Sequence, residues 1–370
     1  MYGVLESDSF FYAIAMSTLG MASGLTIGPE APLIVISGML GSYVAIITEQ
    51  SILAARVLNL TAASAAIAGF FGFPMAGAIF VLEVPHRLGL QYYEALSPSI
   101  IASIVAVLVN RIVTGNEVKG YFKYPFLSQS LPSHVFYIAI LYGLLGAVVG
   151  IIYCRGSFKF KHDVHDLFHD NHGENHHESN EIKEYKFHGS HTKHEKASCS
   201  EKIVDHLHQV EWCRRMVIGS LAGFVVGMIA MFFPHQLFWG EAQLQSIIDR
   251  GHTELPFITE AEVKNMTAYG YCMVNPALHD HDPNFQGYNT LCNGILALLK
   301  VVTAGISLGT GIIGGQFWAP LFTGAAASHV LTDIFSIIYD YTEISAFGIF
   351  CKYPSVALLC MMGATHVVTL

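Results

Sequence analysis

Long apolar segments alternate with shorter polar stretches over most of this chain. We identify the apolar segments at 10–27, 32–48, 61–82, 97–113, 135–154, 215–233, 294–313, 317–337 and 354–370. They are long enough to cross or re-enter a bilayer, and several are interrupted by glycine or proline. Broken helices at membrane depth are tolerated where the backbone lines a cavity. The pattern therefore predicts an all-α integral membrane protein, a multi-helix bundle with broken and re-entrant helices.

Two polar stretches divide this pattern. Residues 155–212 contain eleven of the nineteen histidines and separate a first membrane part, 1–154, from a second, 213–370. So polar a segment predicts a disordered loop, and the lysines and arginines in and next to it place the loop on the cytoplasmic side. The second polar stretch, near 249–292, is then expected on the opposite, non-cytoplasmic face.

Composition supports a membrane protein and adds little chemistry. Hydrophobic residues make up 52% of the chain and charged residues only 13%, which disfavours a soluble protein. The seven cysteines form no CxxC pair, so most are expected to be packing residues or free thiols. Cys272 and Cys292 flank the non-cytoplasmic loop and are candidates for a disulfide. We expect no enzymatic activity, no cofactor, no metal site and no nucleic-acid partner.

Glu30 is the only charged side chain between Ser9 and Thr48. A charge at membrane depth is costly, so it indicates a functional site. Glycines and prolines within 24–32 break the helix beside it, and a helix that starts there has backbone amides without partners. Such amides and the positive end of the helix dipole attract anions, and Glu30 is an anion tethered at that place. The simpler alternative is a helix cap at the membrane interface.

Two further segments share this broken character. Residues 62–84 are rich in small side chains that suit close helix packing, and Pro74 divides the run into two helices. Residues 311–320 form another glycine-rich turn that opens onto a hydrophobic helix. Broken helix starts in separate halves of a chain indicate a substrate site near the membrane midplane. Because helix N-termini attract negative charge, the expected substrate is an anion.

These segments, in this order, resemble three motifs of the ClC family of chloride channels and chloride/proton exchangers. Gly28–Pro32 resembles GxEGP, Phe73–Val84 resembles AxPxAGxxFxxE, and Gly315–Pro320 resembles GxFxP with one extra residue, which leaves its register open by one. The resemblance covers nearly the whole chain outside the His-rich loop. It implies a ClC-like inverted-repeat architecture, chloride as the transported ion, and a homodimer with one pore in each subunit.

The resemblance also assigns roles to residues. Glu30 corresponds to the gating glutamate, which moves in and out of the anion path. The backbone amides that would bind the anion are those at Gly28, Glu30, Ala31, Gln316, Phe317 and Trp318. Pro29 replaces the usual Lys or Arg of the family and so removes a positive charge and an amide donor beside the gate. Ala31 replaces a glycine.

Val84 bears on the distinction between channel and exchanger. In the family's exchangers a second glutamate follows the one that Glu83 matches, and it delivers protons from the cytoplasm. A valine cannot carry a proton, so the resemblance predicts a voltage-gated chloride channel, with a chloride/proton antiporter as the alternative. Glu83 itself lies near His86 and Arg87 and fits a salt bridge or helix cap at least as well as a role in transport.

Other interpretations stay open. The chain has no GSGIP-like segment and ends before the family's tyrosine-bearing helix and CBS domains, which implies truncation at both ends and an inactive fragment as one alternative. A zinc transporter that uses the His-rich loop is another. Five residues on apolar segments are expected to be packing residues: Phe70, Phe71, Phe73, His329 and His366. The preference between chloride and nitrate and the host membrane are not predicted.

Overall fold

The fold, a computed structural model, consists of helices. It describes residues 10–83, 92–115, 122–124, 132–133, 135–168, 217–251, 253, 272 and 288–369. In chain order the helices are α1 (Phe10–Ala22), α2 (Glu30–Ile47), α3 (Ile52–Phe71), α4 (Pro74–Glu83), α5 (Tyr92–Thr114), α6 (Val135–Phe168), a helix over Val217–Phe232, the 3-10 turn η3 (Pro234–Gln236), α8 (Glu241–Ile248), α10 (Thr290–Gly309), α11 (Trp318–Thr342), α12 (Ser345–Lys352) and α13 (Pro354–Thr369). Six of the described helices are long and apolar enough to cross a membrane, or seven if the bent pair α12–α13 is one span. The predicted multi-span, all-α membrane protein with broken helices is confirmed.

The first half of the chain packs α2, α3, α4 and α5 against one another. The predicted break at Pro74 is confirmed, because α3 ends at a left-handed Gly72 and α4 begins at Pro74. The predicted start of α3 at residue 61 is wrong, since Ser51 caps the helix and its side chain accepts a hydrogen bond from the Ala54 amide. In the part of α3 before residue 61, the Asn59 side chain donates to Gly38 and Ser42 of α2. A satisfied asparagine is compatible with a buried helix face.

The second half packs α10, α11 and α13 against the long helix α6. A helix end near residue 154 was predicted, and this is wrong because α6 continues through Phe168. Gly305 and Gly309 of α10 lie directly against that extension, with Gly305 facing the backbone of Ser157. Small residues let helix backbones approach closely, so α10 supports the polar end of α6. Residues 169–212 of the predicted loop lie outside the described residues.

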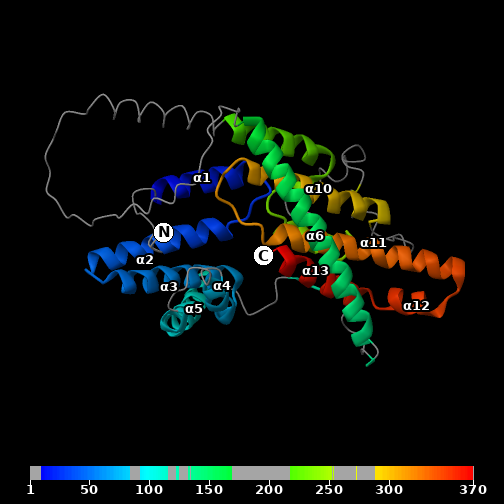
Figure 1. The fold of residues 1–370 in the computed structure, drawn as a ribbon, viewed down its shortest axis with the longest axis horizontal. Coiled ribbons are helices and arrows are strands. Elements are labelled where there is room, and N and C mark those ends of the chain that lie inside the picture. Colours follow the sequence, from blue (N-terminus) through cyan, green and yellow to red (C-terminus); the bar gives the residue numbers. More distant parts are fainter. Residues whose placement is uncertain are drawn as a thin grey trace, which may run out of the picture.

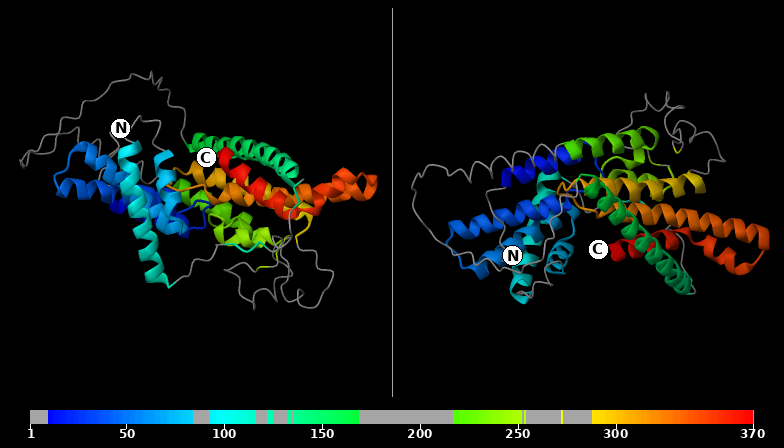
Figure 2. Two further views of the ribbon diagram at one scale, coloured as in Figure 1. Left: turned by 90° about the horizontal axis from the view of Figure 1, so that it is seen from below. Right: turned by 45° about the horizontal axis from the view of Figure 1, so that its top comes forward.

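The two halves lie end to end. Figure 1 shows α1–α3 on one side and α10–α13 on the other, with α2 and α11 directed away from each other from a common centre. Both views in Figure 2 keep α2 and α3 at one end and α12 at the other. At that far end, α12 and α13 meet at an angle of 72°. The centre of the molecule is therefore the place where two helices begin.

The predicted disulfide between Cys272 and Cys292 is confirmed. The two Cα atoms are 5.5 Å apart, and Cys292 lies in the first turn of α10. Cys154, Cys351 and Cys360 are free, as expected.

Candidate anion site at the centre of the molecule

Two glycines from opposite halves of the chain are hydrogen-bonded to each other. The Gly28 amide donates to the Gly315 carbonyl at 2.8 Å, and the Gly315 amide donates to the Gly28 carbonyl at 2.8 Å. The pair is an isolated antiparallel bridge that joins the turn before α2 to the turn before α11. It holds the two glycine-rich motifs at one place.

Glu30 lies against this bridge. It is the first residue of α2 and only 4% exposed. A Cβ atom added to Gly28 or to Gly315 would overlap with Glu30 Oε2, so the carboxylate fits between two positions that have no side chain. Neither carboxylate oxygen has a hydrogen-bond partner among the described residues. A buried, unpartnered carboxylate is expensive, which supports a functional rather than a structural role.

The helices α2 and α11 begin in the same way. Their first three residues are Glu-Ala-Pro and Trp-Ala-Pro, so a proline occupies the third position of each. The amides of the first helical turn have no acceptor within the helix, so a proline at this position costs no hydrogen bond. Neither helix has a side-chain cap. Alignment on the two prolines pairs Glu30 with Trp318 and Pro29 with Phe317.

The positive ends of two helix dipoles therefore meet beside Glu30. The first amides of a helix have no acceptor within that helix, and they bear partial positive charge. At α2 these are the amides of Glu30 and Ala31, since residue 32 is proline. At α11 they are the amides around Phe317 and Trp318. The arrangement suits an anion, and Glu30 provides one.

The remaining predicted site residues differ in what they contact. The Gly28 amide donates within the bridge, so in this structure it does not face an anion. Gln316 extends its side-chain amide to the Ala304 carbonyl of α10, 3.5 Å away. The Trp318 side chain is 4% exposed and lies within interaction range of the Glu30 carboxylate. Val84 lies outside the described residues, and the Glu83 side chain is not described.

Aromatic rings surround the start of α11. The Phe317 ring centroid is 4.5 Å from that of Phe71 and 4.2 Å from that of His366, and Phe122 packs on Trp318 at 5.7 Å. Phe70 and Phe71 are packing residues, as predicted, but Phe71 also reaches the candidate site. An apolar shell of this kind limits water around the helix starts and strengthens electrostatic interactions there.

The two histidines on apolar segments behave differently. His329 is satisfied, as predicted, because Nδ1 accepts from Arg250 Nε at 3.1 Å and Nε2 lies 2.9 Å from the Ile247 carbonyl oxygen. His366 packs, but its Nδ1 has no hydrogen-bond partner among the described residues, so the prediction holds only for packing. In the same described part of the chain, no three His, Cys, Asp or Glu side chains come together as metal ligands.

Two charged residues near the centre were not predicted. Lys300 of α10 is fully buried, and its Nζ donates to the carbonyls of His235 at 3.4 Å and Phe238 at 3.3 Å. Glu241, the first residue of α8, is close enough to Glu30 for their charges to interact. A charge within the apolar run 294–313 was the signal for Lys300. Glu241 gave no such signal, because it lies between the apolar runs 215–233 and 294–313 rather than within one.

Comparisons with known proteins identify a family for most of the chain. A family model described as voltage gated chloride channel matches residues 3–172 and 198–369. A ClcB-like chloride channel protein from Ralstonia nicotianae is 29% identical over 113 residues, which are 30% of this chain and 26% of that protein. A chloride/fluoride channel protein from Pseudomonas syringae is 35% identical over 83 residues, 22% of this chain and 18% of that protein.

A solved structure shares the fold. The crystal structure of a slow cyanobacterial Cl⁻/H⁺ antiporter superposes with a TM-score of 0.56 at 16% sequence identity. The match covers 94% of this chain and 69% of the antiporter. The alignments with the two curated relatives span about a quarter of their length or less.

Proposed function

The chain belongs to the voltage gated chloride channel family, and on this premise we propose that it is a chloride channel whose gate is Glu30. One observation carries the proposal: a buried carboxylate, without a hydrogen-bond partner in the described part of the chain, lies between two hydrogen-bonded glycines where two helix N-termini meet. Chloride and the carboxylate compete for the same positive end charges. Protonation of Glu30, or its displacement by chloride, opens the anion path.

The test is chloride efflux from liposomes that contain the purified protein, measured between pH 4.5 and 8. Wild-type flux is expected to rise as the pH falls, because protonation removes the competing charge. Glu30→Gln is expected to give flux at pH 7.5 about tenfold above wild type and independent of pH. Removing an anion worth up to ~2 kcal/mol at a buried helix N-terminus accounts for a factor of this size.

Glu49→Gln is the matched control, since Glu49 is an exposed glutamate just beyond the other end of α2. Its flux should follow wild type at every pH. A Glu30→Gln protein that retains the wild-type pH profile contradicts the assignment of the gate. A wild-type protein without chloride flux contradicts the proposed function as a whole and favours an inactive fragment.

Passive conduction, rather than exchange for protons, is proposed on the basis of Val84. This residue stands where the family's exchangers have a proton-carrying glutamate, and its side chain has no ionisable group. In bilayer recordings with equal chloride on both sides, we expect a pH gradient to leave the reversal potential at zero. A reversal potential that moves with the pH gradient identifies the antiporter instead.

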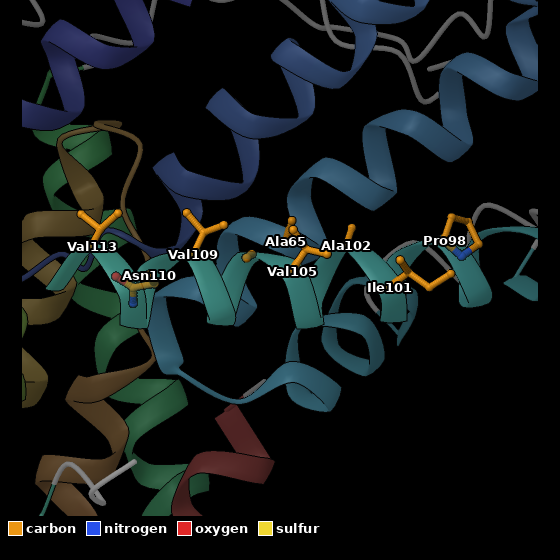
Figure 3. A pocket seen from close by; sticks show the side chains of 9 residues that line it. Ala65, Pro98, Ile101, Ala102, Val105, Val109, Asn110 and Val113 are labelled. Carbon is orange, nitrogen blue, oxygen red and sulfur yellow. The ribbon is translucent and has the colours of Figure 1, made fainter. Parts of the chain in front are cut away.

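We also propose that two copies assemble, each with its own pore. A groove of about 820 Å³ along α5 supports this, since it is lined by apolar and small side chains that suit helix packing (Figure 3). Among its lining residues are Ala65, Ala102, Ala106 and Val109. Val109→Cys is expected to cross-link between copies on oxidation, whereas Val148→Cys, on the exposed face of α6, is not. Equal cross-linking of both variants contradicts an interface at α5.

A further inference from the structure

Four consecutive backbone carbonyls near the candidate site each accept a hydrogen bond from a side chain. They belong to residues 235–238, which lead from η3 into α8 and which we call the carbonyl segment. Lys300 Nζ donates to the first and the last carbonyl, at 3.4 Å and 3.3 Å. Thr26 Oγ1 donates to the second at 3.0 Å, and Gln243 Nε2 donates to the third at 2.7 Å. Buried carbonyls outside a regular helix need such partners, so these side chains fix the path of the segment.

The end of the carbonyl segment has an unfavourable backbone conformation. Phe238 has a φ of 57°, in the left-handed region. A residue other than glycine is disfavoured there and keeps the conformation only where its surroundings fix it. The Phe238 amide donates to the Gly24 carbonyl at 3.1 Å, and the Phe238 carbonyl accepts from Lys300. Both polar backbone groups of this residue are therefore bound by other parts of the chain.

Lys300 lies between the carbonyl segment and α11. It is a fully buried residue of α10, and its Nζ is 5.0 Å from the Phe322 ring centroid. A Cβ atom added to Gly240, just after the carbonyl segment, would lie 3.2 Å from the same Nζ. An ionisable side chain at membrane depth is costly, so its polar contacts indicate its role. For Lys300 those contacts are the two ends of the carbonyl segment.

The carbonyl segment is bound in turn to the backbone before Glu30. Its last amide donates to the Gly24 carbonyl, and its second carbonyl accepts from Thr26 Oγ1. Both bonds join residues more than two hundred positions apart in the chain. Gly24 and Thr26 belong to residues 24–28, which we call the gate turn. The gate turn ends at Gly28 of the glycine bridge, so a shift of this turn also shifts the bridge.

A second contact joins the gate turn to α10 directly. The Thr26 amide donates to Ser307 Oγ at 2.9 Å, and Ser307 is fully buried. Ser307 follows Lys300 by seven positions, which places both residues on the same face of α10, two turns apart. The gate turn is therefore fixed against α10 by two routes, one through Ser307 and the other through Lys300 and the carbonyl segment.

The position of the gate turn determines how well the two helix starts bind an anion together. The gate turn leads into the first amides of α2, which meet those of α11 beside Glu30. Donors that are already in place need no ordering when the ligand arrives, and this raises affinity. A gate turn that moves relative to α10 separates the two sets of amides and weakens anion binding.

We propose that Lys300 is a positioning residue for the anion site: by fixing both ends of the carbonyl segment, it holds the gate turn where its helix can bind chloride. The inference rests on the proposed function, since it concerns the affinity of that same site. Lys300 acts through the carbonyl segment and not through contact with the anion. Its loss is therefore expected to change the affinity for chloride, whereas the number of anions carried at saturation stays the same.

The test is chloride efflux from liposomes over a range of chloride concentrations, which separates the half-saturating concentration from the maximal flux. Lys300→Met, which keeps the length of the side chain but has no donor, is expected to raise the half-saturating chloride concentration about fivefold, the effect of one net hydrogen bond. The maximal flux should stay near wild type. Lys352→Met, at the exposed end of α12, is the control for loss of one positive charge. A lower maximal flux with an unchanged half-saturating concentration overturns the proposal, because it shows a loss of folded protein only.

Thr26→Val tests the same route at its other end and stays decisive if Lys300→Met does not fold. It removes the hydroxyl that bonds to the carbonyl segment, so the half-saturating chloride concentration should rise by a similar factor. Lys300→Met/Thr26→Val should have no more effect than the larger single change, because both break one connection. Lys300→Met/Ser307→Ala should instead multiply the two single effects, because Ser307 acts by a separate route. An unchanged Thr26→Val, or multiplied effects in both double variants, overturns the proposal.

The failure of this inference is distinguishable from the failure of the proposed function. Wild-type protein without chloride flux contradicts the proposed function. If wild type conducts, Glu30→Gln loses its pH dependence and Lys300→Met follows Lys352→Met, only the role of Lys300 is wrong.

Discussion

Alanine at Gly28 or at Gly315 will reduce chloride flux at every pH by at least about tenfold, without unfolding the protein. The added methyl group would take the space that Glu30 Oε2 occupies between the two glycines. The displaced group is the end of a flexible side chain, so Glu30 can move aside at little cost to the fold. The methyl group stays, however, and it excludes chloride from the same space.

The backbone does not forbid these substitutions. Neither glycine has a positive φ, so alanine can adopt the native conformation and keep the hydrogen bonds of the bridge. The effect is therefore expected at the anion site rather than on stability. A loss of about 1.4 kcal/mol in anion affinity corresponds to the tenfold change. Efflux from liposomes gives the flux, and thermal unfolding in detergent checks that the fold is retained.

A double variant separates two explanations of such a loss. If the methyl group blocks the site, Gly28→Ala/Glu30→Ala will conduct as poorly as Gly28→Ala. If the methyl group acts only by moving Glu30, the double variant will conduct like Glu30→Ala. Gly143→Ala on α6 is the control, since its added Cβ would contact nothing within 4 Å. Flux equal to wild type in both glycine variants contradicts the placement of the anion path.

Sequence analysis identified the central candidate site because Glu30 is the only charged residue in a long apolar stretch. Glu30 is a single ionisable residue within an apolar run, and the glycines and prolines beside it marked a helix start. Local chemistry of this kind can be read without the fold. The pairing of Gly28 with Gly315 could not, since it joins residues in separate halves and depends on how the halves pack.

Sequence analysis treats a charge within an apolar segment as a sign of a functional site, yet it passed over two residues that also meet this criterion. Lys300 and Asp333 are charges within apolar segments, yet no glycine–proline frame surrounds them. The structure shows that both are satisfied, Lys300 by backbone carbonyls and Asp333 by Arg250. A charge within an apolar segment therefore indicates a polar partner first. It makes a candidate transport site when, as at Glu30, the described residues offer no hydrogen-bond partner.

Helix lengths show where pattern analysis fails for a different reason. The last part of α6 is polar in sequence, so the hydropathy pattern predicted that this helix ends at residue 154, whereas it continues to Phe168. Its continuation packs on Gly305 and Gly309 of α10, a contact between distant segments. Hydropathy measures what a bilayer favours, whereas a helix continues wherever another helix supports it.

Loss of the Arg250 charge is the second large effect that we expect, and it concerns stability. Arg250 Nη2 donates to Asp333 Oδ1 at 2.6 Å, and both side chains are about one-fifth exposed. Asp333 also accepts from Thr290 Oγ1 at 2.9 Å, so the network joins the end of α8 to α10 and α11. Arg250→Met keeps much of the side-chain volume but leaves Asp333 ionised without its cation. We expect a loss of about 2 kcal/mol, below the usual cost of breaking a fully buried pair because water screens part of the charge.

The double variant Arg250→Met/Asp333→Asn should recover part of that stability, because it removes the stranded charge together with its partner. Asp340→Asn, at the exposed end of α11, is the control and should melt like wild type. Thermal unfolding in detergent measures all four proteins. If Arg250→Met unfolds at the same temperature as the control, the ion pair contributes nothing to stability. If it melts early and the double variant melts earlier still, the arginine acts through packing rather than charge. Recovery in the double variant is the result that the network requires, since the cost then lies in the unpaired carboxylate of Asp333 on α11.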